Sequence, residues 1–140
     1  MPVYAQQTQK IKELIIKILL QKYPKLSAIY LFGSFVNNTS HQKSDIDIAI
    51  LAEYSLDKYD IWQIAQEIAS KVYKDVDLID LVRASLVMRN QIITKGICIY
   101  QADSLVRDIF EDYVYSAYAR FNEERKAILN SITQRGTIYG

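Results

Sequence analysis

Four short runs of β-branched and aromatic residues alternate along this chain with longer stretches of helical periodicity. The strand-like runs lie at 27–32, 45–51, 75–81 and 97–100. The helical stretches lie at 7–23, from 55 or 57 to 72, at 85–94, and from 103 or 104 to about 133. Pro24 ends the first helix and Gly96 the third. This alternation predicts an α/β domain, of the α+β kind, in which helices flank a small mixed sheet.

The size and composition of the chain predict one folded domain over residues 1–140. Half of the residues are hydrophobic and 24% are charged, which is enough apolar surface for a core and unlike a disordered protein. The formal net charge is only +1. A protein that neutralises many phosphates along DNA or RNA is usually far more basic, so we expect no direct binding of nucleic acid.

The cysteine content and the N-terminal sequence predict a cytoplasmic protein. Cys98 is the only cysteine, so no disulfide can form within the chain, which agrees with a reducing compartment. Residues 1–10 lack the pattern of a signal peptide, and Lys17 interrupts the apolar run at 14–20. We therefore expect neither secretion nor a membrane span.

The residues that suit chemistry gather where the first two strand-like runs face each other. Gly33 and Ser34 follow the first run, and a small residue beside a hydroxyl suits a phosphate. A polar connection at 37–40 then leads to Asp45 and Asp47 at the start of the second run. Residues two apart on a strand point to the same face, so these carboxylates can bind one or two hard cations together.

Each part of this pattern also has a purely structural explanation. An Asp-x-Asp sequence occurs on the solvated face of half-exposed strands, and Gly-Ser is a common turn. The agreement of turn, spacing and flanking strands favours a functional site. Phosphate binding beside a metal site indicates phosphoryl-type transfer.

Further carboxylates are expected on the third strand-like run, which contains Asp75, Asp77 and Asp80. The first two share one face of the strand, and Asp80 belongs to the other. Clustered carboxylates repel one another, and a divalent cation such as Mg²⁺ removes that cost. Two ions about 4 Å apart would hold the attacking and the leaving oxygens of an in-line displacement. Spacing alone does not decide which of the three aspartates completes the site.

Gly-Ser-Phe at 33–35, with Ser-Asp-Ile-Asp at 44–47 and the apolar residues up to 51, resembles the signature of the DNA polymerase β-like nucleotidyltransferase superfamily. The segments at 76–81, 95–100 and 107–113 are similar to minimal nucleotidyltransferases of the MNT type. The resemblance therefore extends over nearly the whole chain. It implies the palm-like fold of that superfamily, followed by a long C-terminal helix.

The resemblance also implies roles for particular residues. Gly33 and Ser34 match the positions that bind the triphosphate of ATP. Asp45 and Asp47 match catalytic residues that bind Mg²⁺, and Asp77 falls at the third catalytic and metal-binding carboxylate. Two Mg²⁺ ions and ATP as the substrate follow from the same resemblance.

The partner expected from the resemblance is a HEPN-domain toxin in a hetero-oligomer. Members of this group are antitoxins that transfer AMP from ATP to a tyrosine of such a ribonuclease toxin. One alternative is an antitoxin that masks its toxin by stoichiometric binding alone, and the clustered carboxylates disfavour it. Another is a nucleotidyltransferase for a small molecule such as an aminoglycoside, and the short chain disfavours that.

Two aromatic features lie outside this site, and we expect both to be buried. Trp62 lies on the second helix, and Phe110, Tyr113, Ala117 and Phe121 form a stripe on the last helix. A stripe at helical spacing is more often core than interface. Its aromatic content leaves a docking or oligomer surface as the second interpretation.

Overall fold

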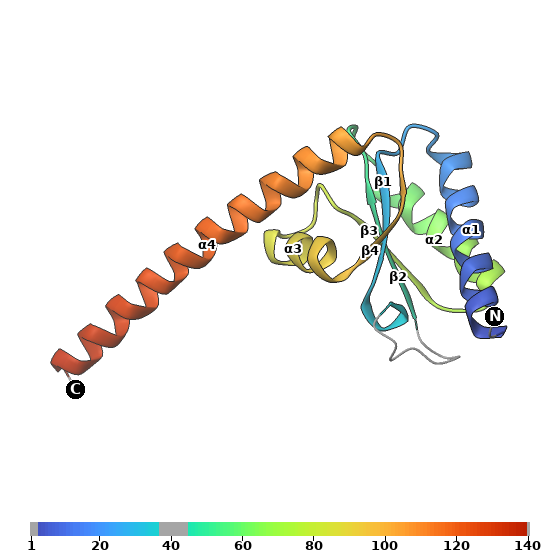
Figure 1. The fold of residues 1–140 in the computed structure, drawn as a ribbon. Helices are drawn as coiled ribbons and strands as arrows, with labels where there is room; N and C mark the ends of the chain where they lie inside the picture. Colours follow the sequence, from blue (N-terminus) through green and yellow to red (C-terminus); the bar gives the residue numbers. More distant parts are fainter. Residues whose placement is uncertain (1–2, 37–44, 140) are drawn as a thin grey trace.

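The computed structural model describes residues 3–36 and 45–139, and in it helices cover both faces of a four-stranded sheet (Figure 1). The elements follow in the order α1 (Val3–Lys22), β1 (Ala28–Phe32), the 3₁₀ helix η1 (Gly33–Phe35), β2 (Ile46–Leu51), α2 (Lys58–Val72), β3 (Val76–Asp80), α3 (Leu86–Lys95), β4 (Ile97–Gln101) and α4 (Ser104–Tyr139). The polar connection expected at 37–40 lies outside the described residues. The predicted order of strands and helices is confirmed.

The sheet is mixed, as predicted. Its strand order is β3-β2-β1-β4, in which β1 runs antiparallel to both β2 and β4. Strands β2 and β3 are parallel, because α2 carries the chain back between them. This arrangement puts the end of β1 beside the starts of β2 and β3.

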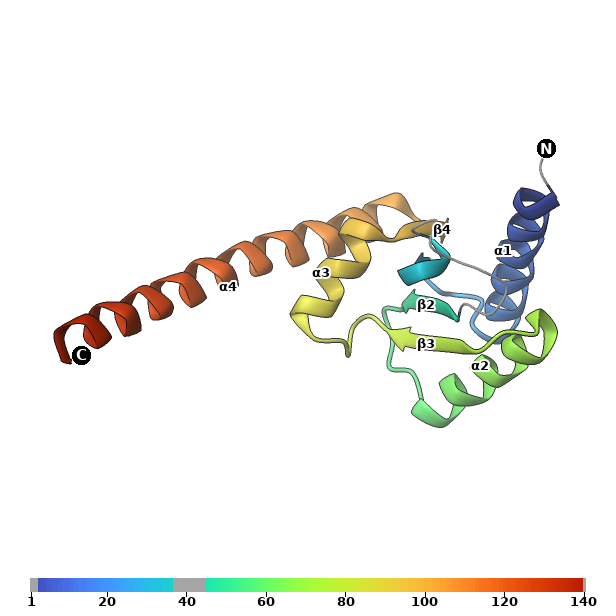
Figure 2. The same cartoon turned by 90° about the horizontal axis from the view of Figure 1, so that it is seen from below.

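Two hydrophobic cores lie on the two faces of the sheet. Figure 2 shows the helices that cover them, with α1 and α2 on one side of the sheet and α3 and α4 on the other. On one face α1 and α2 cover alternate strand residues such as Ile29 and Ile48. On the other face α3 and the first turns of α4 cover the residues between them, such as Tyr30 and Ala49. Alternating side chains on each strand therefore serve both layers, which explains why these strands are apolar almost throughout.

Local signals fix where the helices end. The side chain of Ser85 accepts a hydrogen bond of 3.1 Å from the backbone N–H of Met88 and caps the start of α3. Gly96 ends that helix, and a Cβ built there would lie 2.8 Å from the backbone oxygen of Leu31. Only glycine allows β4 to begin this close to β1.

Helix α4 departs from the sequence prediction in its length and its burial. It continues to Tyr139 rather than ending near Thr133, because no proline interrupts it, and it extends well away from the sheet (Figure 1). Tyr113 is 63% exposed and Phe121 is 38% exposed, so the expectation that these two residues are buried is wrong. No helix within the described residues is long and apolar enough to cross a membrane.

The prediction for Trp62 is also wrong, because its side chain is 58% exposed. Its ring stacks instead on that of Tyr59, with 6.2 Å between the ring centroids. The core face of α2 is formed by Ile64, Ala65 and Ile68, and Trp62 lies off that face.

Candidate functional site

The predicted acidic residues meet at the edge of the sheet where β2 and β3 begin. Asp47 pairs in register with Phe32 at the end of β1 and with Asp77 on β3. Register partners on neighbouring strands point to the same face, so the two carboxylates lie side by side on the face that α3 and α4 cover further along. Asp45 immediately precedes β2 and is exposed. We call Asp45, Asp47 and Asp77 the acidic cluster.

The turn at Gly33 lies directly against this cluster. Gly33 has a φ of 78°, in the left-handed region that glycine adopts without strain. A Cβ built on Gly33 would overlap the Oδ2 atom of Asp47. The backbone N–H of Val36 donates a hydrogen bond of 3.1 Å to the carbonyl oxygen of Gly33 and closes η1, which also carries the half-exposed Ser34. The predicted phosphate-binding turn and the predicted metal-binding carboxylate therefore share one small space.

The electrostatics of the acidic cluster are unfavourable without a cation. Partial burial raises the pKa of the Asp47 carboxyl, and the negative charges of Asp77 and Asp45 raise it further. Asp47 is half-buried between two exposed carboxylates, so water screens its charge less than theirs. A bound cation would remove both the repulsion and part of the cost of burial.

The donor set suits a hard divalent cation, since carboxylate oxygens are the ligands that Mg²⁺ and Ca²⁺ prefer. Within residues 3–36 and 45–139, no group of three or more His, Cys, Asp and Glu side chains is arranged so that it could hold a metal ion, so the three carboxylates of the acidic cluster do not form a complete three-ligand site in the positions that they occupy here. The carboxylates of the acidic cluster would supply the oxygen donors for such a cation. Beside them lies open space, because Gly33 has no Cβ.

The other two aspartates of β3 lie elsewhere. Asp75 is exposed just before the strand, and its backbone oxygen accepts a hydrogen bond of 2.9 Å from the N–H of Ile46. Asp80 pairs in register with Ile50, which belongs to the core on the opposite face. Its carboxylate accepts a hydrogen bond of 3.2 Å from the N–H of Val82 and lies 3.8 Å from Nε of Arg83. Of these three aspartates, only Asp77 is a register partner of Asp47.

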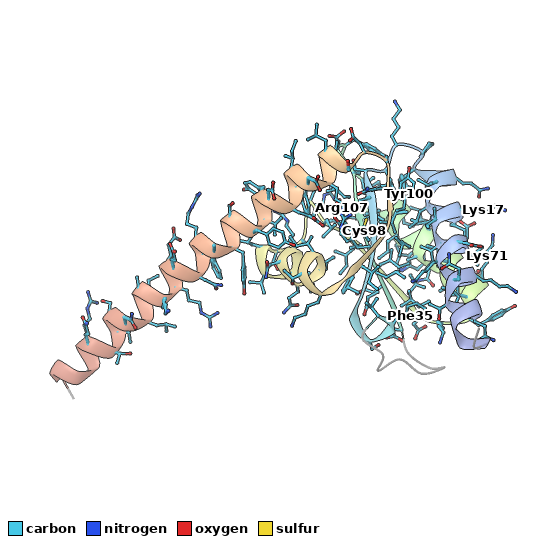
Figure 3. The ribbon with its side chains drawn as sticks, viewed as in Figure 1. Lys17, Phe35, Lys71, Cys98, Tyr100 and Arg107 are labelled. Atoms are coloured by element: carbon cyan, nitrogen blue, oxygen red, sulfur yellow. The ribbon has the colours of Figure 1, made fainter. Side chains whose placement is uncertain are left out.

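A second polar cluster on the same face was not predicted. The hydroxyl of Tyr30 donates a hydrogen bond of 3.0 Å to Oε1 of Glu111, and Nε of Arg107 donates one of 3.1 Å to the same oxygen. The guanidinium of Arg107 also lies 5.7 Å from the centre of the Tyr30 ring. Figure 3 shows Arg107 reaching from α4 toward Cys98 on β4. We call Tyr30, Arg107 and Glu111 the Tyr30 cluster.

The Tyr30 cluster joins the base of α4 to the centre of the sheet. Burial raises the pKa of the Tyr30 phenol, and the charge of Glu111 raises it further, so the hydroxyl stays protonated. The only sequence signal was the spacing of four between Arg107 and Glu111, which is common on helix surfaces. Tyr30 is 81 residues from Glu111, so no local pattern could connect them.

Comparisons with known proteins find similarity over most of the chain. The family model described as "Polymerase beta, Nucleotidyltransferase" matches residues 13–105. The protein adenylyltransferase MntA of Shewanella oneidensis is 42% identical over 120 residues, which cover 84% of this chain and 84% of that protein.

Solved structures are similar over most of the chain. A toxin-antitoxin structure with AMP-PNP superposes with a TM-score of 0.78 at 40% identity, covering 87% of this chain and 98% of that one. A structure of the tri-AMPylated Shewanella oneidensis HEPN toxin in complex with MNT antitoxin gives a TM-score of 0.75 at 37% identity, covering 90% and 98%.

Proposed function

This chain belongs to the polymerase beta nucleotidyltransferase family, and from that membership we propose that it transfers AMP from ATP to a tyrosine of a HEPN-domain toxin. By modifying the toxin it acts as the antitoxin of a toxin–antitoxin pair. The observation that carries this proposal is the 42% identity, over most of both chains, to a protein adenylyltransferase. A relative of similar identity has been solved in complex with an AMPylated HEPN toxin, which supports the same acceptor.

We propose that Gly33 and Ser34 hold the triphosphate. The left-handed backbone at Gly33 would let main-chain N–H groups of the turn donate to phosphate oxygens, and the missing Cβ leaves room for these oxygens beside Asp47. The hydroxyl of Ser34 adds a further donor on the same turn. This placement brings the phosphates of ATP to the acidic cluster.

The acidic cluster is proposed to hold the cations. Divalent metal together with ATP is general for this family, and here we propose Mg²⁺, two ions, bound by Asp45, Asp47 and Asp77. When bound, these ions neutralise charge on the phosphates and lower the pKa of the acceptor hydroxyl. The pairing of Asp47 with Asp77, and the position of Asp80 on the other face, support Asp77 as the third carboxylate.

The proposed reaction is an in-line displacement at the α-phosphorus of ATP. The tyrosine oxygen of the toxin forms a bond to that phosphorus, and the bond to the bridging oxygen breaks to release pyrophosphate. Asp77, which is exposed beside the half-buried Asp47, accepts the proton of the tyrosine hydroxyl. The chain otherwise contributes positioning, because the turn at Gly33 fixes the phosphates relative to the carboxylates. The product is an AMP–tyrosine ester, and the γ-phosphate leaves with the pyrophosphate.

We also propose that one domain within residues 1–140 carries the whole reaction and that the toxin supplies the acceptor in a hetero-oligomer. Cys98, the only cysteine of the chain, supports a reducing compartment such as the cytoplasm, where ATP is abundant. The alternative antitoxin that only masks its toxin would have no use for the acidic cluster.

Co-expression with the toxin tests the proposal. The intact mass of the toxin is measured after co-expression with the wild-type chain, with Asp47→Asn, and with the matched control Asp108→Asn, which changes an exposed carboxylate on α4. We expect mass additions of whole AMP units on toxin tyrosine with wild type and with the control, and none with Asp47→Asn. An unmodified toxin that every version neutralises would instead establish stoichiometric masking.

A further inference from the structure

The apolar stripe of α4 continues beyond the last contact of this helix with the rest of the fold. Phe110 packs on the second core and Val114 is fully buried in it. Farther along the helix the same face carries large apolar side chains that are 38–61% exposed: Phe121, Ile128, Leu129 and Ile132. At 100° per residue all of them lie within about 60° of Val114. Figure 1 shows no other element of the described chain beside this part of α4.

The opposite face of the same segment is polar. Glu123, Lys126, Asn130 and Gln134 lie there, all exposed. The segment is therefore an amphipathic helix without a partner. A helix that exposes a continuous apolar stripe is only marginally stable on its own in water, and such a stripe normally marks an interface.

We propose that this stripe pairs with the same stripe of a second copy of this chain, with the two α4 helices antiparallel. The stripe is self-complementary when the two-fold axis passes between Glu124 and Arg125. Phe121 then lies opposite the partner's Ile128, and the small Ala117 lies opposite the partner's Ile132. The overlap from Ala117 to Ile132 is about 24 Å long and stops short of the face that α3 already covers.

The charges of Glu124 and Arg125 favour this register of the two helices over neighbouring registers. Arg125 lies within the apolar stripe, where an unpaired cation buried on association would be costly. In the proposed register Arg125 faces the partner's Glu124, and symmetry repeats the ion pair on the other side of the axis. A two-fold axis through Arg125 itself would instead place it against the partner's Arg125. Opposite charges at such positions fix the register of paired helices.

The ring of Tyr118 is already arranged for this contact. It stacks on Phe121 with 6.3 Å between centroids, so the two aromatic rings form one surface before any partner binds. Rigid aromatic side chains lose little conformational freedom on association, which favours their use in interfaces.

The oligomeric state of the full chain, measured by sedimentation across a concentration series, tests the proposal. We expect a concentration-dependent dimer that Ile128→Glu weakens by about tenfold or more. The matched control is Ala127→Glu, which introduces the same side chain one position away on the exposed polar side of the helix and should leave the dimer intact. A wild-type chain that stays monomeric throughout, or equal effects of the two variants, would overturn the proposal.

A charge exchange tests the register. Arg125→Glu alone and Glu124→Arg alone should each weaken the dimer, because like charges then meet across the axis. The double variant Glu124→Arg/Arg125→Glu should restore it, since the exchanged pair is again complementary. A stripe that serves only to dock a different protein, such as the toxin, predicts a monomer without rescue. None of these changes touches the acidic cluster, so AMP transfer is scored independently.

Discussion

The acidic cluster and the Tyr30 cluster lie on the same face of the sheet, but they differ in how their polar groups interact. The groups of the Tyr30 cluster attract one another, whereas the carboxylates of the acidic cluster repel one another. Along β1, Tyr30 and Phe32 are two residues apart, and Phe32 is the register partner of Asp47. In the Tyr30 cluster the phenol, the carboxylate and the guanidinium satisfy one another. In the acidic cluster both charges that act on Asp47 have its own sign. A polar cluster whose hydrogen bonds are satisfied within the chain indicates a structural role. A cluster of mutually repelling charges indicates a site that binds a ligand of opposite charge.

The largest expected difference between the two clusters is in catalysis. Asp47→Asn should lower the rate of AMP transfer by about 10³-fold, because one proposed ligand of the cations is lost where charge develops on the phosphates. Glu111→Gln retains a side-chain oxygen for Tyr30 and should change the rate by less than about twofold. Single-turnover transfer to purified toxin measures both. Equal losses in the two variants would mean that the clusters do not differ in role.

The two structurally constrained glycines offer a second contrast. Gly33→Ala should lower AMP transfer by about 10²-fold, because the Cβ overlaps Asp47 and the left-handed backbone is strained. A Cβ on Gly96 would meet the backbone oxygens of Ile92 and Leu31 and the Cβ of Phe32, and none of these nearest atoms belongs to a carboxylate. Gly96→Ala should destabilise the fold by about 1–3 kcal/mol and leave the rate of the folded fraction unchanged. Urea unfolding and transfer rates for both variants separate the two effects.

The Tyr30 cluster should show its role in stability. Glu111→Ala leaves the Tyr30 hydroxyl and the Arg107 guanidinium without their shared acceptor, and should cost about 2–3 kcal/mol in the free energy of unfolding. Glu111→Gln should cost clearly less, because its amide oxygen can still accept from Tyr30. Urea unfolding at neutral pH measures both. A Glu111→Ala variant as stable as Glu111→Gln would show that the cluster contributes little.

The smallest effect is expected in the metal-free stability of Asp47→Asn. The pKa of Asp47 is raised in the folded state, so folding disfavours its ionised form. Wild type should therefore lose stability relative to Asp47→Asn as the pH rises above about 4, the usual pKa of an aspartate, and the gap should level off above the raised pKa. Thermal unfolding in EDTA should show a higher Tm for the variant at pH 7, at about 2–4 °C per kcal/mol. A variant that melts below wild type at pH 7 would contradict this sign.

The sequence predicted the elements because local signals determine them. The third helix was predicted to start at Ser85, which caps it, and the alternation along β2 sets Asp47 on the face opposite Ile48 without any knowledge of the fold. Spacing along the sequence could not decide which aspartate of the third strand lies beside Asp47. Asp75, Asp77 and Asp80 lie within six residues, and only the parallel register with β2 brings Asp77 beside Asp47.

Contacts between distant segments were beyond the reach of sequence patterns. From the sequence alone, Tyr30 is indistinguishable from the apolar residues of its strand. Its polar role depends on Glu111, which α4 places beside it in the fold. The predictions that Trp62 and Tyr113 are buried were wrong for a related reason. Helical periodicity shows that a face is apolar, but it does not show which element covers that face, or whether one does.

Transfer of label from ATP to the purified toxin tests the catalytic assignment most directly. The chain, the toxin and Mg²⁺ are incubated with ATP labelled at either the α- or the γ-phosphate, and the label on toxin tyrosine is measured for wild type, Asp47→Asn and Glu111→Gln. We predict α-label on the toxin with wild type and Glu111→Gln, transfer of α-label about 10³-fold slower with Asp47→Asn, and no γ-label with any of them. Label from the γ-phosphate, or α-label transferred by Asp47→Asn at the wild-type rate, would contradict AMP transfer by the acidic cluster.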